Sequence, residues 1–216
     1  MARAARLSMH RAYRYQSFPF TPPPELGRGE IFRHPLIVIG CGPVGLAAAI
    51  DARQHGIPVL ILDDDDTVSV GSRGLCYAKR TLEILDRLGC GDPVANKGVG
   101  WDVGRTFFRE EEVFNFNLRP QTGYKRPGMV NLQQYYLEEY MVKRALDAGV
   151  QIRWKNEVTA VSPREDHVAL EVSTPQGKYT LETDWLVVAD GARSPVRAML
   201  GLDIEGQVFM DRFLIA

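Results

Sequence analysis

Residues 36–63 read LIVIGCGPVGLAAAIDARQHGIPVLILD, and this stretch decides the fold. Four apolar residues precede Gly40, and a second apolar run covers residues 58–62. Both runs predict buried strands, and residues 44–54 between them predict a helix with small residues facing a sheet. A strand, a glycine turn, a helix and a second strand within about 30 residues form a βαβ unit. The sequence therefore predicts a parallel sheet and an α/β fold.

The turn after the first strand carries a G-x-G-x-x-G motif. Gly40 permits the sharp turn, Gly42 lets a pyrophosphate approach the backbone, and Gly45 lets the helix pack close to the strand. The helix start offers unpaired N–H groups and a partial positive charge to the phosphates. The predicted cofactor-binding residues here are Gly40, Gly42, Pro43, Val44 and Gly45. The alternative is a tight strand–helix turn without a ligand.

Asp63 ends the second predicted strand, 18 residues after Gly45. Dinucleotide folds place an acid about 20 residues after the glycine motif, where it binds a ribose hydroxyl. Asp63 opens a run of four aspartates, of which Asp65 and Asp66 are better explained as a solvated acidic turn. Four acids would also repel a 2′-phosphate, which argues against NADP in this position.

The remaining chain continues the α/β pattern. Apolar spacing predicts helices over 78–88 and 131–147, and weak alternation predicts a strand pair over 106–118. Short strands are expected to form an antiparallel meander at 151–154, 157–162, 167–173 and 178–183. Residues 185–189, WLVVA, predict one more buried strand.

That last strand would deliver Asp190 and Gly191 to its carboxyl end, and a short helix with Pro195 near its start follows. In open α/β sheets, ligands bind outside the carboxyl ends of the strands. We therefore expect Asp190 and Gly191 to lie near the glycine turn.

The glycine motif and the Asp190–Gly191 pair together resemble the motifs of the FAD-dependent aromatic-ring hydroxylases, the family of p-hydroxybenzoate and phenol hydroxylases. Within it the likeness is to enzymes of the 3-(3-hydroxyphenyl)propionate hydroxylase type. The resemblance implies a Rossmann-like FAD-binding domain with FAD as the cofactor and NADH or NADPH as the reductant. It also implies hydroxylation of a small phenolic or aromatic substrate with O₂, in which the flavin performs the chemistry.

Three further cofactor contacts come from the resemblance alone. Ser72-Arg73-Gly74 resembles the segment where an arginine reaches the flavin, and residues 133–138 resemble the start of a helix that touches FAD through Gln134. Val158 is expected to lend its backbone to the adenine. The alternatives are a surface arginine for Arg73, an ordinary first-turn residue for Gln134, and a core valine for Val158.

The resemblance also sets the expected domains. Residues 1–34 form a basic, Pro-rich arm, 35–205 the N-terminal portion of the FAD-binding domain, and 206–216 the first strand of a truncated substrate domain.

The family's downstream G-D-A-A-H motif does not occur in the sequence, so the domain is expected to be incomplete: a fragment, a truncation or half of a split enzyme. No residue of the chain is predicted to be catalytic, because the family's substrate contacts lie mostly downstream. An Arg-rich targeting peptide is the alternative for the arm.

Composition excludes several function classes. The chain has 26 Lys and Arg against 27 Asp and Glu, a formal net charge of −1, so we expect no nucleic-acid partner. Three cysteines and four histidines are scattered without ligand spacing, which predicts no metal site and a reducing, cytoplasmic compartment. No apolar run reaches the ~18 residues of a membrane span. Two alternative functions remain open: a non-catalytic FAD-binding remnant and an NAD-dependent dehydrogenase. The partner could be a complementing chain or a second copy in a homodimer.

Overall fold

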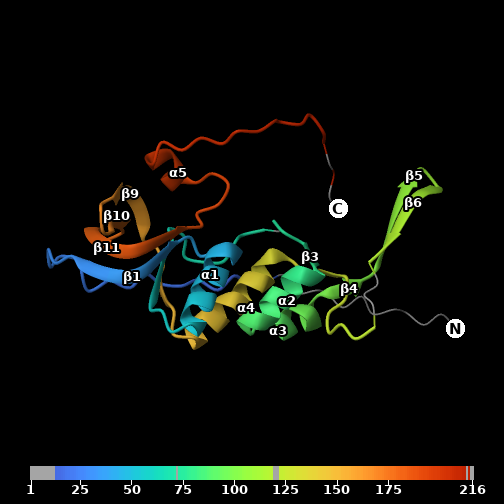
Figure 1. Cartoon of the computed structure of the whole chain (residues 1–216), viewed down its shortest axis with the longest axis horizontal. Helices are drawn as coiled ribbons and strands as arrows, with labels where there is room; N and C mark the ends of the chain where they lie inside the picture. The colour runs from blue at the N-terminus through green and yellow to red at the C-terminus, as the bar shows by residue number, and fades with distance from the viewer. Residues whose placement is uncertain (1–12, 72, 119–121, 213, 215–216) are drawn as a thin grey trace. The chain divides into compact units, whose positions relative to one another are not determined.

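The computed structural model describes residues 13–71, 73–118, 122–212 and 214. The chain forms two compact units, and Figure 1 shows their helices and strands. The first unit consists of Met1–Phe20 and Asp65–Tyr140, and the second of Thr21–Asp64 and Met141–Ala216. The predicted glycine turn lies in the second unit, whereas Arg73 and Gln134 lie in the first.

A six-stranded sheet with the strand order β8-β2-β1-β11-β10-β9 forms the centre of the second unit. Its strands are β1 (Phe32–Ile39), β2 (Val59–Leu62), β8 (Gln151–Arg153), β9 (Glu157–Pro163), β10 (Val168–Thr174) and β11 (Gly177–Val188). β1 pairs in parallel with β2 and β11, whereas β9, β10 and β11 pair antiparallel. Helix α1 (Pro43–Gln54) connects β1 to β2. The predicted βαβ unit and parallel sheet are confirmed, and three of the four strands predicted for the meander pair antiparallel.

The core of the second unit lies along the sheet. Apolar side chains of five neighbouring strands form one buried cluster, which includes Ile37, Leu60, Leu170, Val172 and Leu181. Helix α1 buries Leu46 and Ile50. Because β1 runs parallel to β2 and β11, the carboxyl ends of these three strands lie at the same edge of the sheet.

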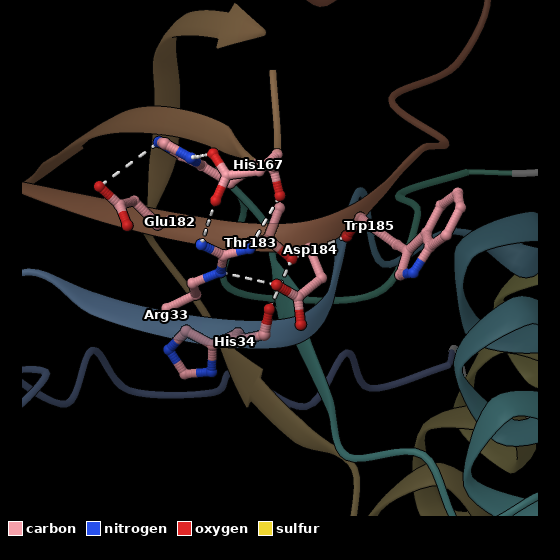
Figure 2. Close-up of polar contacts among 8 residues, drawn as sticks. Arg33, His34, His167, Glu182, Thr183, Asp184 and Trp185 are labelled. Atoms are coloured by element: carbon pink, nitrogen blue, oxygen red, sulfur yellow. Dashed lines mark hydrogen bonds and ion pairs between the residues drawn. The ribbon is translucent and has the colours of Figure 1, made fainter. Parts of the chain in front are cut away.

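Polar contacts pin the start of β1 to β11, as Figure 2 shows. Arg33 Nε donates to Asp184 Oδ1 at 2.6 Å, and Arg33 Nη1 donates to Asp166 Oδ2 at 3.0 Å. The hydroxyl of Thr183 lies 3.0 Å from the carbonyl oxygen of His34 and 2.7 Å from that of Trp185. These ion pairs are exposed, so they contribute little net stability.

The first unit combines short strands with helices. It contains β3 (Cys76–Ala78), α2 (Lys79–Leu88), α3 (Gly91–Lys97), β4 (Val99–Trp101), β5 (Val103–Phe108), β6 (Glu111–Asn117) and β7 (Met129–Asn131). Helix α4 (Gln134–Asp147) begins in the first unit and ends in the second. α2 ends at Gly89, whose φ of 86° is left-handed, and β5 and β6 form the predicted strand pair.

Three predicted strands and one helix start need correction. Residues 151–154 were expected in the meander, but β8 pairs in parallel with β2, because it follows helix α4. The segments predicted at 178–183 and 185–189 form one strand that ends at Val188, since β1 pairs with β11 from Leu181 to Val188. Asn131 belongs to β7 and not to the helix, which begins at Gln134.

The end of β11 is not buried as predicted. Trp185 is 75% exposed and Val188 is 40% exposed. The pairing of β10 with β11 stops at Thr183, so in the described part of the chain the last residues of β11 have β1 as their only sheet neighbour.

The strand predicted for residues 206–216 does not form in the described part of that segment. Residues 206–212 and 214 are exposed and adopt neither helix nor strand. The short helix predicted near Pro195 is present as α5 (Pro195–Met199). None of the helices in the described residues has the length and apolar content required to cross a membrane.

Candidate functional site

The glycine turn is packed tightly against the end of β11. Gly40 has a left-handed φ of 100°, which favours glycine. A Cβ atom on Gly40 would lie 2.4 Å from the carbonyl oxygen of Ala189, so the close approach of the turn to β11 also requires glycine. The Gly40 amide donates to the carbonyl oxygen of Leu62 at 2.8 Å, which joins the turn to the end of β2.

The start of α1 has the form that an anion site needs. A Cβ atom on Gly45 would lie 2.0 Å from the carbonyl oxygen of Gly40, so this glycine lets the helix contact the turn, as predicted. Gly42 is the N-cap of α1 without a side-chain capping bond, and Pro43 follows it as the first helical residue. No atom lies within 4 Å of a Cβ built on Gly42, and the side chain of Val44 is exposed. The backbone at Gly42 is therefore open to a ligand at the start of α1, where the first N–H groups of a helix have no partner within the helix.

Asp63 lies against this turn. It follows β2 directly, and its Oδ2 atom accepts a hydrogen bond from the Cys41 amide at 2.5 Å. Its own backbone is held from the other side, because the Asp63 amide donates to the Arg153 carbonyl at 3.1 Å and the Asn156 amide donates to the Asp63 carbonyl at 2.8 Å. The structure thus brings the predicted acid to the predicted glycine turn.

The backbone of Asp190 also reaches the turn, since a Cβ atom on Gly40 would lie 3.1 Å from the Asp190 amide nitrogen. The Ala189 amide donates to the carbonyl oxygen of Ile39 at 2.8 Å, which extends the parallel pairing to the residue before Asp190. Asp190 Oδ2 accepts from the Ser194 hydroxyl at 2.8 Å and from the Val196 amide at 3.1 Å. The Asp190 carboxylate therefore caps the start of α5, where its negative charge is favoured.

Val158 has the features of a core residue. Its side chain is buried in β9 and belongs to the main apolar cluster of the second unit together with Ile39 and Leu62. Its backbone lies two residues after Asn156, which bonds to Asp63. The segment that carries Val158 is thus anchored at the same edge of the sheet as the predicted acid.

Gln134 and the Arg73–Gly74 segment come together in the first unit. Gln134 Oε1 accepts from the Gly74 amide at 2.8 Å, and Gln134 Nε2 donates to Glu138 Oε1 at 2.7 Å. The side chain of Arg73 is exposed, and Ser72 of the same predicted segment lies outside the described residues. The Gln134 amide therefore holds in place the loop that carries Arg73.

Sequence reasoning assigned no role to Glu138, which organises this loop. Its carboxylate is buried and accepts from the Ser69 amide at 2.6 Å and from the Ser69 hydroxyl at 2.8 Å. Burial, followed by the charge of Glu138, raises the pKa of Tyr77 to about 12. The only sequence signal for Glu138 is its position four residues after Gln134, which places both on one face of α4.

Comparisons with known proteins place these features in a family context. A family model described as "FAD binding domain" matches residues 33–214. Para-nitrophenol 4-monooxygenase of Pseudomonas sp. (strain WBC-3) is 30% identical over 184 residues, which cover 83% of this chain and 45% of that protein. A 3-(3-hydroxy-phenyl)propionate/3-hydroxycinnamic acid hydroxylase of Mycolicibacterium smegmatis is 24% identical over 189 residues, which cover 83% of this chain and 32% of that protein.

One solved structure shares the fold closely. The crystal structure of p-nitrophenol 4-monooxygenase from Pseudomonas putida DLL-E4 superimposes with a TM-score of 0.78 at 30% identity, covering 83% of this chain and 46% of that one. This chain therefore spans less than half the length of these relatives. The matches confirm the predicted resemblance to flavin-dependent aromatic hydroxylases.

Proposed function

Because this chain belongs to the FAD binding domain family, we propose that its glycine turn, Asp63 and the Asp190–Gly191 segment hold the dinucleotide of FAD. The observation that carries the proposal is that these three elements meet at the carboxyl edge of the strands β1, β2 and β11. Ligands of open α/β sheets bind at such an edge.

The geometry of the turn fits a pyrophosphate. The open space beside Gly42 lets the phosphates approach the backbone, and the start of α1 supplies N–H groups and a partial positive charge. Pro43 and Val44 begin this helix without closing the approach, since the Val44 side chain is exposed. Asp63 would bind a ribose hydroxyl, because its carboxylate is already oriented toward the turn by the Cys41 amide.

The other predicted residues would contact FAD farther along the cofactor. Val158 would offer its backbone to the adenine, as its anchoring near Asp63 supports. Arg73 would reach the flavin with its exposed guanidinium group. Gln134 would act mainly by holding the Gly74 amide beside Arg73, since both ends of its own amide are hydrogen-bonded within the first unit.

For the longer protein that such a domain serves, we propose a flavin-dependent monooxygenase that hydroxylates a small aromatic substrate, with NADH or NADPH as the reductant and O₂ as the oxidant. FAD supplies the redox and oxygen-transfer chemistry when it is bound. The residues of this chain bind and orient the cofactor. We also propose a reducing, cytoplasmic location, as the few scattered cysteines of the sequence suggest.

Cofactor identity is the first test. The purified protein is heated, and the released nucleotide is identified by its visible spectrum and by chromatography against FAD, FMN and NAD standards. FAD is expected, and release of NAD without flavin would refute the proposed cofactor. Activity is tested on a longer protein that contains this domain, by oxygen consumption with a nitrophenol or phenol panel and NADH or NADPH. FAD binding without substrate-dependent oxygen consumption or hydroxylated product would favour a non-catalytic FAD-binding protein.

A further inference from the structure

A buried polar network links the N-terminal arm to Asp63. Glu25 belongs to this arm, yet it is only 2% exposed. Arg153, at the end of β8, is also buried, and its Nη2 atom donates to Glu25 Oε1 at 3.0 Å. Burial, followed by the charge of Arg153, lowers the pKa of His34, the other basic residue beside Glu25. At neutral pH, Arg153 is therefore the cation that pairs with Glu25.

The network continues from Arg153 toward the nucleotide site. Arg153 Nη1 donates to the Tyr179 hydroxyl at 3.2 Å, and this hydroxyl donates to Asn156 Oδ1 at 2.6 Å. The Asn156 side chain is almost completely buried, and its Nδ2 atom donates to the Trp154 carbonyl at 2.8 Å. The buried polar chain thus consists of Glu25, Arg153, Tyr179 and Asn156.

This chain fixes the turn that holds Asp63. Lys155, between Arg153 and Asn156, has a φ of 56°, which non-glycine residues rarely adopt. The turn therefore needs support from its neighbours, and the Asn156 side chain supplies it from within. The Asn156 amide and the Arg153 carbonyl bond to the backbone of Asp63 on its two sides.

Buried charge of this kind favours defined geometry more than stability. The attraction within a buried ion pair is largely offset by the loss of hydration, whereas a broken pair leaves an uncompensated charge. We infer that the buried polar chain positions Asp63 for the adenosine half of the cofactor, so that Glu25 in the arm influences nucleotide binding without touching the nucleotide. The inference rests on the proposed FAD function.

The test uses two variants and one control. Tyr179→Phe removes the hydroxyl in the middle of the polar chain at nearly constant volume, and Glu25→Gln removes the charge at its arm end. The matched control is Tyr140→Phe, because no hydrogen bond of the Tyr140 hydroxyl occurs in the described structure and Tyr140 has no role in the proposed site. FAD affinity is measured by flavin fluorescence for the wild type, the single variants and the Tyr179→Phe/Glu25→Gln double variant.

We expect each single variant to raise the Kd for FAD by about fivefold, the effect of one net hydrogen bond. The double variant should weaken binding by less than the product of the two effects, because both act through one chain. Tyr140→Phe should change the Kd by less than about twofold. A wild-type Kd in Tyr179→Phe, or multiplicative effects in the double variant, would overturn the inference.

Hydrogen exchange in the unloaded protein provides a readout that does not depend on FAD. In Tyr179→Phe the amides of Cys41 and Asn156 should exchange faster, whereas the amides of Ile37 and Val38 in β1 should keep their wild-type rates. Equal acceleration at all four amides would show general destabilisation and contradict a positioning role. If the wild type binds no FAD but the selective acceleration still occurs in Tyr179→Phe, the proposed function is refuted, whereas the link between the polar chain and Asp63 stands.

Discussion

Replacement of Asp63 by alanine probes the proposed ribose contact directly. The change removes the carboxylate that accepts from the Cys41 amide at 2.5 Å and, under the proposal, the charge-assisted hydrogen bond to the ribose. A charge-assisted bond of this kind contributes about 1–3 kcal/mol, so the Kd for FAD should rise roughly 5- to 150-fold. Flavin fluorescence titration of the purified variant measures this rise.

Two companion variants separate the ribose contact from the support of the turn. Asp63→Asn retains an oxygen that can accept from the Cys41 amide, so it should preserve the turn and lose less affinity than Asp63→Ala. Asp65→Ala, two residues on in the acidic run, should change the Kd far less, since Asp65 is exposed. Equal losses in Asp63→Ala and Asp65→Ala would show that the acid has been assigned incorrectly.

Three further predictions follow from named contacts. Gly45→Ala would place a methyl group 2.0 Å from a backbone oxygen, so we expect the free energy of unfolding in urea to fall by about 1–3 kcal/mol and FAD binding to weaken. The methyl group of Gly42→Ala would meet no atom within 4 Å, so this variant should keep wild-type stability but bind FAD less tightly. Glu138→Ala leaves the Ser69 donors without their acceptor and should lower the unfolding free energy by about 1–3 kcal/mol. The pKa of Tyr77 is raised to about 12 in the folded protein, so between about pH 10 and 12 the hydroxyl loses its proton more readily in the unfolded chain. Urea melts at increasing pH should therefore show the wild type losing stability relative to Tyr77→Phe over this range.

The outcomes that would contradict these predictions are equally specific. Unchanged stability in Gly45→Ala would mean that helix α1 does not contact the turn as described. Wild-type FAD affinity in Gly42→Ala would contradict the proposed position of the pyrophosphate beside the Gly42 backbone. Wild-type stability of Glu138→Ala, or a constant stability difference between the wild type and Tyr77→Phe across the alkaline range, would show that the loop in the first unit is held by other contacts.

Local sequence signals predicted the elements that carry the site. Gly40 and Gly45 are glycines because backbone atoms lie where a side chain would begin, and such constraints leave a fixed spacing in the sequence. The position of Asp63 follows from the length of strand β2, and the short helix α5 from Pro195 near its start. These features depend on residues that are close together in the chain.

Features that depend on distant partners were not predictable in the same way. Glu25 and Arg153 are separated by 128 positions, so nothing local distinguishes a buried glutamate in the arm from a solvated one. The three-residue strand β7 is too short to show a period, which is why Asn131 was assigned to the following helix. The end of β11 is exposed because its pairing with β10 stops at Thr183, and this cannot be seen from the local sequence WLVV, which by itself predicts a buried strand.

The most direct test of the central claim is a crystal structure of the protein with FAD bound. The account predicts that the pyrophosphate lies at the start of α1 beside Gly42, with a ribose hydroxyl within about 3 Å of the Asp63 carboxylate. FAD bound at another edge of the sheet, or with its ribose directed away from Asp63, would contradict the proposed site.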